Sequence, residues 1–280
     1  MNVIDKIPTD SRVHAVTSVD DELFVLLDRD VDQVAVYSIN DYQLLRHLSV
    51  PGLKPNKCND MTSCVRNKCL YISDSPNSCV HRYQLTNKRK WGAESKISRW
   101  QVPYRPCDLS VTPGCNLLVR CWGEADKHNK LVELSADSGR CVREITLQSD
   151  MKYPSHGVQL TTGQLVVCHG VGLRNLHRVC LVDDDGEVAQ SYGGQCGSGD
   201  GQLHNPCYLA VDQDSQCIIV ADSYNHRITL LTPTLQFVRH VTTKKYIIHK
   251  RSNPCRLHLH QATRRLFIAK GTSYVPVLQM

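Results

Sequence analysis

The stretch that decides the fold is residues 202–240, QLHNPCYLAVDQDSQCIIVADSYNHRITLLTPTLQFVRH. Four short runs in it are rich in Val, Ile, Leu and Thr, and each is bounded by Asp, Asn, Ser or Pro. Such runs are typical of strands, and their close spacing predicts a four-stranded antiparallel meander. The expected strands are residues 208–211, 217–221, 227–231 and 236–241. One such sheet cannot bury both of its faces alone, so we expect the chain to repeat it.

The opening strand of this unit recurs along the chain. Similar runs begin near Val13, Cys58, Cys107, Ser155, Cys207 and Cys255, at intervals of 45 to 52 residues. Four short strands in each period of about 40 to 50 residues indicate propeller blades. The last unit has room for only three strands, whereas residues 1–9 resemble an outer strand. We therefore expect one all-β domain over residues 1–280, a six-bladed β-propeller closed by an N-terminal strand that completes the last blade.

The cysteine pattern favours free thiols. The chain has 14 Cys but no Cys-x-x-Cys and no Cys₂His₂ spacing, and several Cys lie in expected strands. There they act as small apolar residues. With no N-terminal apolar segment and no Asn-x-Ser/Thr sequon, we expect an intracellular, reducing, cytoplasmic location. No apolar run approaches the roughly 18 residues of a membrane helix, so no membrane partner is expected.

Charge is distributed unevenly along the chain, whose formal net charge is +6. Residues 1–50 contain nine Asp/Glu and four Lys/Arg, whereas residues 223–280 contain ten Lys/Arg and no acidic residue. In a closed ring these regions are neighbours, so an acidic sector adjoins a basic one. This charge distribution is consistent with an ordinary solvated surface. The alternative is a surface that binds nucleic acid or an acidic protein.

Several motifs resemble the NHL-repeat family of six-bladed β-propellers. Blade five has GDGQL at 199–203, LAVD at 209–212, IVAD at 219–222 and NHRI at 225–228, in the family's order, and blade two keeps YISD at 71–74. The resemblance implies a recognition platform similar to the C-terminal NHL domain of TRIM-type ubiquitin ligases, which binds protein or RNA. No RING, B-box or coiled-coil pattern is present. The sequence leaves open whether the chain is a fragment of such a ligase or a stand-alone propeller.

Three polar patterns are expected to be structural. Short side chains between two strands bond backbone amides, so Asp222, Asn225, Asp74 and Asn77 should hold tight loops. Residues 183–186, DDDG, read as a hairpin turn, because the spacing does not match a calcium loop. The Gly-rich run 193–202 should connect two blades, since a strand rather than a helix follows it. We expect no cofactor and no metal site.

Candidate partner-binding or RNA-binding residues come from one face of the disc. The loops that enter each innermost strand and those that join the second and third strands place there Arg29, Arg105, His156, His169, Arg174, His204, Tyr208, Tyr224, His226, Arg256 and Lys270. A basic run adds Lys244, Lys245, Lys250 and Arg251. Arg and Lys neutralise phosphates, and Tyr and His stack on unpaired bases. The set suits single-stranded RNA rather than duplex DNA, because there is no recognition helix. An ordinary surface distribution is the alternative.

Signatures of catalysis are weak. There is no Gly-x-Ser-x-Gly and no His-Glu-x-x-His. His156, His169 and His258 are candidates for a lactonase-type or lyase-type site, but no carboxylate is expected at a corresponding blade position. We therefore expect a non-catalytic, monomeric platform that binds a protein partner. The resemblance to TRIM-type ligases implies that such a platform presents substrates for ubiquitination. Single-stranded RNA binding is the alternative, and a propeller lactonase or lyase is the third hypothesis.

Overall fold

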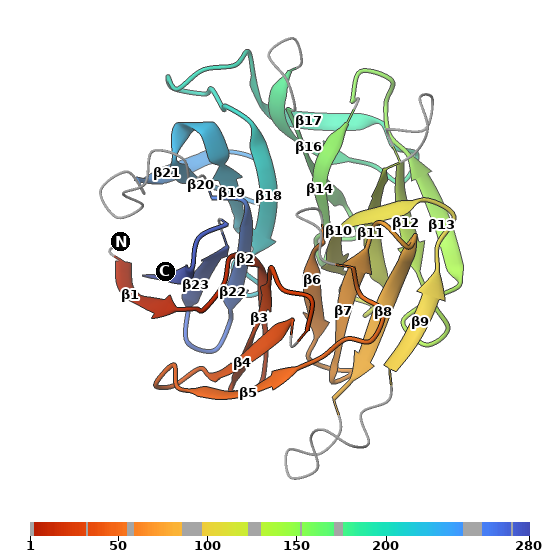
Figure 1. Ribbon diagram of the computed structural model, residues 1–280. Coiled ribbons are helices and arrows are strands. Elements are labelled where there is room, and N and C mark those ends of the chain that lie inside the picture. The colour runs from red at the N-terminus through yellow and green to blue at the C-terminus, as the bar shows by residue number, and fades with distance from the viewer. Residues whose placement is uncertain are drawn as a thin grey trace.

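The chain forms six antiparallel sheets of four strands each, arranged around a central axis (Figure 1). The structure is a computed structural model that describes residues 3–31, 33–54, 59–85, 97–122, 130–151, 153–170, 176–242, 254–269 and 271–280. The expected all-β, six-bladed propeller is confirmed. In the described part of the chain the one helix is a 3₁₀ turn, Ser223–Asn225, and no helix has the length and hydropathy needed to cross a membrane.

Each blade is a meander in which the first strand lies innermost. Blade one contains β2 (Val13–Val19), β3 (Glu22–Leu27), β4 (Val34–Ser38) and β5 (Leu44–Leu48). Blade two contains β6 (Met61–Cys64), β7 (Cys69–Asp74), β8 (Cys79–Gln84) and β9 (Ile97–Gln101). Blade three contains β10 (Arg105–Val111), β11 (Leu117–Trp122), β12 (Lys130–Leu134) and β13 (Cys141–Thr146). Blade four contains β14 (Pro154–Gln159), β15 (Leu165–His169), β16 (His177–Val182) and β17 (Val188–Gly194). Blade five contains β18 (Pro206–Val211), β19 (Ile218–Asp222), β20 (Arg227–Leu231) and β21 (Phe237–Thr242).

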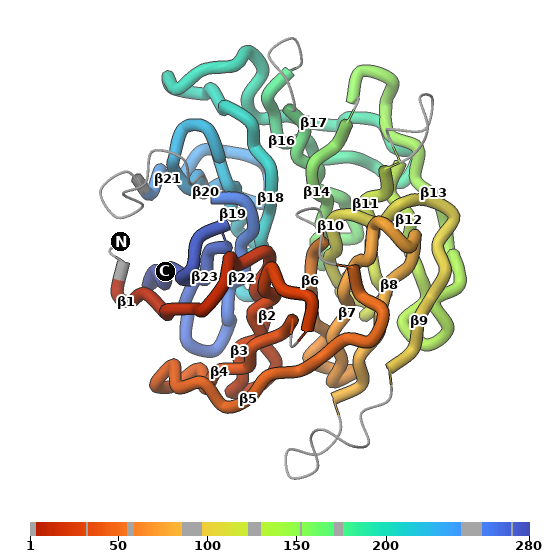
Figure 2. Tube along the Cα trace, viewed as in Figure 1, coloured from red at the N-terminus to blue at the C-terminus, as the bar shows by residue number. Residues whose placement is uncertain are grey.

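Blade six joins the two ends of the chain. It contains β22 (Arg256–His260), β23 (Arg265–Ala269) and β24 (Tyr274–Gln279), and its outer strand is β1 (Val3–Pro8). Val3 lies opposite Leu278, and Pro8 lies opposite Tyr274. Figure 2 shows the N-terminal strand beside the C-terminal one. The predicted closure by an N-terminal strand is therefore confirmed.

The hydrophobic core is divided among the blade junctions. One cluster packs Ala15 and Phe24 of blade one against Met61 and Leu70 of blade two, and every other cluster also combines residues of two neighbouring blades. Each sheet thus buries both faces against its neighbours, which satisfies the need that a single meander cannot meet. The stability of the ring is shared among these junctions.

The two faces of the disc are defined by the direction of the innermost strands. Because every blade has the same strand order, β2, β6, β10, β14, β18 and β22 all run the same way along the axis. We call the face where these six strands begin the entry face, and the face where they end the exit face. The loops that join second and third strands also lie at the entry face, since Trp122 at the end of β11 pairs with Arg105 at the start of β10.

The polar turns behave as their sequences predict. Asp222 is fully buried and accepts hydrogen bonds from His204 N at 2.7 Å and from Asn225 Nδ2 at 2.8 Å. Asp183 closes the β16–β17 hairpin, because its Oδ1 accepts bonds from the backbone N–H groups of Asp185 and Glu187. These carboxylates hold backbone amides, as Asx-type turns do.

Candidate functional site

A β-bulge near the start of four innermost strands positions side chains of the candidate site. The register shifts between Pro106 and Asp108 in β10, and the same shift occurs at the equivalent place in β2, β14 and β18. A bulge leaves one residue unpaired and re-aims the side chain that follows. The residue after the bulge is Asp108 in blade three, His156 in blade four and Tyr208 in blade five, and Arg256 takes the equivalent place in blade six. One repeat position therefore supplies four polar side chains to the channel.

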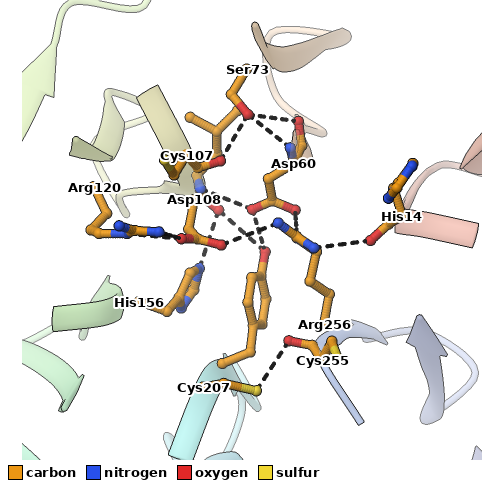
Figure 3. Close-up of polar contacts among 12 residues, drawn as sticks. His14, Asp60, Ser73, Cys107, Asp108, Arg120, His156, Cys207, Cys255 and Arg256 are labelled. Atoms are coloured by element: carbon orange, nitrogen blue, oxygen red, sulfur yellow. Dashed lines mark hydrogen bonds and ion pairs between the residues drawn. The ribbon is translucent and has the colours of Figure 1, made fainter. Parts of the chain in front are cut away.

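Arg256 is the centre of this cluster. Its Nε lies 2.8 Å from Asp60 Oδ1, and its Nη2 lies 3.4 Å from Asp108 Oδ1. Figure 3 shows the guanidinium between these two carboxylates, with Arg120 on the far side of Asp108. Arg120 Nε donates to Asp108 Oδ2 at 2.9 Å. Two buried acids thus face two cations, which is the condition under which buried charges are tolerated.

An aromatic pair completes the cluster. The rings of His156 and Tyr208 stack with centroids 3.7 Å apart. Tyr208 Oη donates to Asp60 Oδ2 at 2.9 Å, and the Leu109 N–H donates to the same oxygen at 2.9 Å. The Leu209 N–H donates to His156 Nδ1 at 3.3 Å, so His156 Nε2 carries the proton and faces the Leu109 carbonyl at 3.3 Å. Both nitrogens of the imidazole are therefore engaged by backbone groups.

Burial shifts the pKa values of these groups. It raises the pKa of the Asp60 carboxyl to about 6, against the opposing effect of Arg256. It lowers the pKa of His156 to about 4, because a charged imidazolium would be poorly solvated there. The pKa of Tyr208 lies well above its usual value for the same reason, with Asp60 adding to the effect. At neutral pH the histidine and the tyrosine are therefore uncharged.

The cluster joins all six blades. Asp60 precedes β6 of blade two, and blades three to six contribute Asp108, His156, Tyr208 and Arg256. Blade one takes part through the His14 carbonyl, which accepts from Arg256 Nη1 at 3.3 Å (Figure 3). Shifted pKa values can mark catalytic groups, but structural ion-pair networks shift them too. Here the network fixes the blades relative to one another.

A cavity of about 1230 Å³ lies between the cluster and the exit face. His156 and Tyr208 line its inner end, and most of its wall is made of hydroxyl, amide and aliphatic side chains from the ends of the innermost strands. Ser18 Oγ lies 2.6 Å from His258 Nε2 in this wall. Burial lowers the pKa of His258 to about 3, so its imidazole is a weak base. The cavity is large enough for a small ligand.

Exposed aromatic groups lie at the entry face over blades three to five. Trp122 is 47% exposed, and its ring centroid lies 5.9 Å from that of Tyr153. Tyr224 is 54% exposed and meets His204 edge-on at 5.1 Å. His204 in turn meets His177 at 5.6 Å. These contacts position large side chains that remain accessible to a partner.

The predicted candidate residues that the structure describes fall into two groups. His156, His169 and Tyr208 are buried, and the side chain of Arg256 is 12% exposed, so these four are held within the fold. Those at least partly exposed at the entry face are Arg29, Arg105, His204, Tyr224 and His226. The remaining candidates, Arg174, Lys244, Lys245, Lys250, Arg251 and Lys270, lie outside the described residues, as does Cys58.

Arg29 and His226 also make contacts within the chain. Arg29 Nη1 pairs with Asp10 Oδ2 at 2.9 Å. His226 caps the 3₁₀ turn with a left-handed backbone, φ 51°. Among the partly exposed candidates, Tyr224 and Arg105 therefore offer the most accessible groups.

One sequence expectation needs correction. His156 was expected to have no carboxylate at a corresponding blade position, but Asp108 occupies that position in blade three. Asp60 and Arg120 are not among the residues predicted from the sequence. For the repeat position a usable signal was present, because a polar residue follows the recurrent Cys in blades three, five and six: Asp108, Tyr208 and Arg256 follow Cys107, Cys207 and Cys255.

Comparison with solved structures shows the fold alone. A selenomethionine virginiamycin B lyase from Staphylococcus aureus has 10% sequence identity, with 99% of this chain and 88% of that chain covered and a TM-score of 0.59. A catalytically inactive virginiamycin B lyase from the same organism, with quinupristin, has 11% identity, 99% and 98% coverage and a TM-score of 0.64. Hydrazine synthase from Kuenenia stuttgartiensis has 14% identity, 98% and 97% coverage and a TM-score of 0.64.

No known family's sequence profile matches the chain, and no curated protein sequence matches it. The topology and the structural neighbours together define the class of protein. The chain is a repeat protein of the six-bladed β-propeller class. Its central channel carries an ionic cluster that bridges the blades.

Proposed function

We propose that the chain is a non-catalytic recognition platform, of the kind formed by the NHL domains of TRIM-type ubiquitin ligases, that binds a polypeptide at its entry face. The observation that carries this proposal is the group of exposed, positioned rings of Trp122 and Tyr224. Tryptophan, tyrosine and arginine supply most of the energy in protein interfaces, and side chains ordered before binding lose less entropy. In a ligase setting, the bound polypeptide would be presented for ubiquitination by a module outside this chain.

The channel supports the same proposal. Each carboxylate of the central cluster already meets a cation or a hydroxyl of the chain, and both nitrogens of His156 meet backbone groups. A general base must reach a substrate proton, and these groups are committed to each other. If the chain is a lactonase or lyase, the remaining candidate for its active site is the cavity near the exit face. Two histidines of its wall, His258 and His260, are poorly suited to take a proton because burial lowers the pKa of each imidazole.

Single-stranded RNA is the second candidate ligand. The same face combines exposed rings with the exposed guanidinium of Arg105. In addition, Arg120 Cζ lies 5.9 Å from the Trp122 ring centroid. Aromatic platforms flanked by Arg bind unpaired bases. RNA would bind with a strong salt dependence, because phosphate contacts release counterions.

The test compares the wild type with Trp122→Ala/Tyr224→Ala. Immobilised protein is used to capture polypeptides, and is also titrated with a random single-stranded RNA pool at about 50 and 200 mM salt. The matched control is Val142→Ala, which truncates a side chain that is 54% exposed but lies on an outer strand. We expect the double variant to lose specific polypeptides that the control retains, and RNA to bind weakly at both salt concentrations.

Three results would contradict this expectation. Identical capture by all three proteins would remove the entry face as the binding surface. Salt-sensitive RNA binding that the double variant loses would make RNA the ligand. Turnover of a lactone or a cyclic depsipeptide that survives the double substitution would favour an enzyme acting through the exit-face cavity.

A further inference from the structure

A cluster of three different donor side chains lies inside blade two. Asp74 ends β7, Cys79 begins β8, and His81 follows two residues later on the same face of β8. Each of the three is at most 1% exposed. His81 Nε2 lies 3.0 Å from Asp74 Oδ2 and 3.7 Å from Cys79 Sγ. A carboxylate, a thiol and an imidazole thus converge on one point.

Blade five has a different set of side chains around the equivalent loop. There Asp222 pairs with Arg227 Nε at 2.6 Å, and Thr229 Oγ1 lies 3.0 Å from His240 Nδ1. Both blades have an Asn in the loop that holds the carboxylate. Asn77 Nδ2 donates to Asp74 Oδ2 at 2.8 Å, and Asn225 Nδ2 donates to Asp222 Oδ2 at the same distance.

Three of the positions around this carboxylate differ between the two blades in a way that bears on metal binding. Cys79, His81 and Arg99 of blade two stand where blade five has Arg227, Thr229 and His240. Blade five meets its carboxylate with a guanidinium, which cannot bind a metal ion. Blade two replaces that guanidinium with a thiol and adds an imidazole. Both are ligands that zinc-type ions prefer.

We propose that Asp74, Cys79 and His81 bind a divalent transition-metal ion of the zinc type, with water as the fourth ligand. Zinc bonds of about 2.0–2.2 Å to N and O and about 2.3 Å to S place tetrahedral N and O ligands about 3.3 Å apart, and N and S ligands about 3.5 Å apart. The corresponding separations in the protein are 3.0 and 3.7 Å. Small side-chain movements therefore suffice to admit the ion.

Binding of the ion releases two protons from the ligand side chains. The ion forms bonds to Asp74 Oδ2, Cys79 Sγ and His81 Nε2, and it displaces the Nε2 proton that lies between His81 and Asp74 together with the thiol proton. The carboxylate and the thiolate then offset its two positive charges. Arg99 Nε, 3.1 Å from Cys79 Sγ, continues to donate to the sulfur, and Asn77 continues to hold the carboxylate. Such outer hydrogen bonds orient metal ligands.

Cobalt(II) is the direct probe, because a cobalt–thiolate bond gives a charge-transfer absorption band. Chelator-treated, reduced full-length protein is titrated with Co²⁺, and bound Co²⁺ is then displaced with Zn²⁺. We expect one equivalent to produce the band, Zn²⁺ to abolish it, and Zn²⁺ to raise the melting temperature. Cys79→Ser should lose the band. Cys180→Ser, which alters an equally buried thiol in blade four, should keep it.

A second variant guards against loss of folding. Cys79→Arg/His81→Thr places the blade-five side chains in blade two, so it should fold and bind no metal. Two results would overturn the proposal: a band of equal strength in Cys79→Ser, or no band and no thermal shift in the wild type with metal in molar excess. In either case the cluster would serve only as an Asp–His pair in place of the Asp–Arg pair of blade five.

Discussion

At the scale of single residues, one side chain per blade decides what the channel contains. The position after the bulge carries Asp108, His156 and Tyr208, and the equivalent Arg256 lies between Asp60 and Asp108. Buried ion pairs add little net stability, but removing one partner is costly because the other charge is left buried. The cluster is therefore best understood as a device that sets the register of the blades.

Replacement of Asp60 tests the hypothesis that the central cluster holds the blades in register. Asp60→Asn keeps the shape but removes the charge that lies 2.8 Å from Arg256 Nε. We expect the free energy of unfolding to fall by about 3–5 kcal/mol, as for other broken buried pairs. Urea denaturation measures the change. Asp41→Asn, at an exposed turn, is the control and should unfold like the wild type; equal losses in both variants would show that the central pair has no special role.

The pKa of His156 predicts acid sensitivity. Its folded-state pKa of about 4 lies below the ordinary value of 6.5, so the unfolded chain binds the proton more readily in this window. Stability from this group is complete above pH 6.5 and is lost as the pH falls toward 4. Between pH 7 and 5 the wild type should lose about 2 kcal/mol more than His156→Gln, as judged by denaturant unfolding at each pH. Parallel curves for the two proteins would refute this assignment.

Residue-level prediction from the sequence succeeded only where contacts are local. The roles of Asp222 and Asn225 followed from their places in a short loop, and the structure confirms them. Asp60 was missed because its partners Tyr208 and Arg256 lie in other blades, far away in the chain. Arg120 was missed because its contact with Asp108 depends on the register of the β10–β11 pair. The burial of Tyr208 was missed because it depends on a bulge that periodicity does not reveal. The burial of Arg256 was missed because its partners, Asp60 and Asp108, lie in other blades.

At the scale of elements, the repeated meander was predictable because hydrophobic alternation and turn residues act within each unit. Strand β1 is the instructive case, since its partner β24 lies at the other end of the chain. One isoleucine of this strand is buried and another faces solvent. Ile7 is 1% exposed and packs with Phe267 and Val275, whereas Ile4 is 47% exposed. Closure of the ring therefore depends on the packed face of this strand.

Two alanine variants measure that dependence. Ile7→Ala should lower the free energy of unfolding by about 2–5 kcal/mol, because it removes a buried side chain at the junction of blades six and one. Ile4→Ala should change it by less than about 0.5 kcal/mol, since the side chain is largely exposed. Thermal or urea unfolding distinguishes the two. A large loss in both would mean that strand propensity, and not packing, secures β1.

At the scale of the whole molecule, hydrophobic packing occurs at six blade junctions, and no disulfide bond links the described residues. Every cysteine in the described part of the chain is a free thiol, and most of them are buried. Fourteen Cys in one chain suggest a disulfide framework at first sight. Most of the described ones are instead buried free thiols, which pack as small apolar residues.

A reducing agent should therefore leave the melting temperature unchanged. The measurement is thermal unfolding with and without reductant, combined with thiol counting before and after denaturation. Cys141, exposed on an outer strand, should be among the first thiols to react in the native protein. A melting temperature that falls on reduction would reveal a disulfide that stabilises the ring.

The pairing of β1 with β24 also has a consequence for synthesis on the ribosome. Residues 3–8 emerge before every other strand of the ring, whereas their partner strand, Tyr274–Gln279, is the last strand of the ring to be translated. At about 5–20 residues per second, the first strand waits on the order of ten seconds to a minute for its partner. During that interval Ile7 and the apolar edge of blade one have no cover from blade six. The ring is thus a fold in which assembly cannot finish before translation of its final strand, and a nascent chain stalled in blade six would present an apolar edge to chaperones.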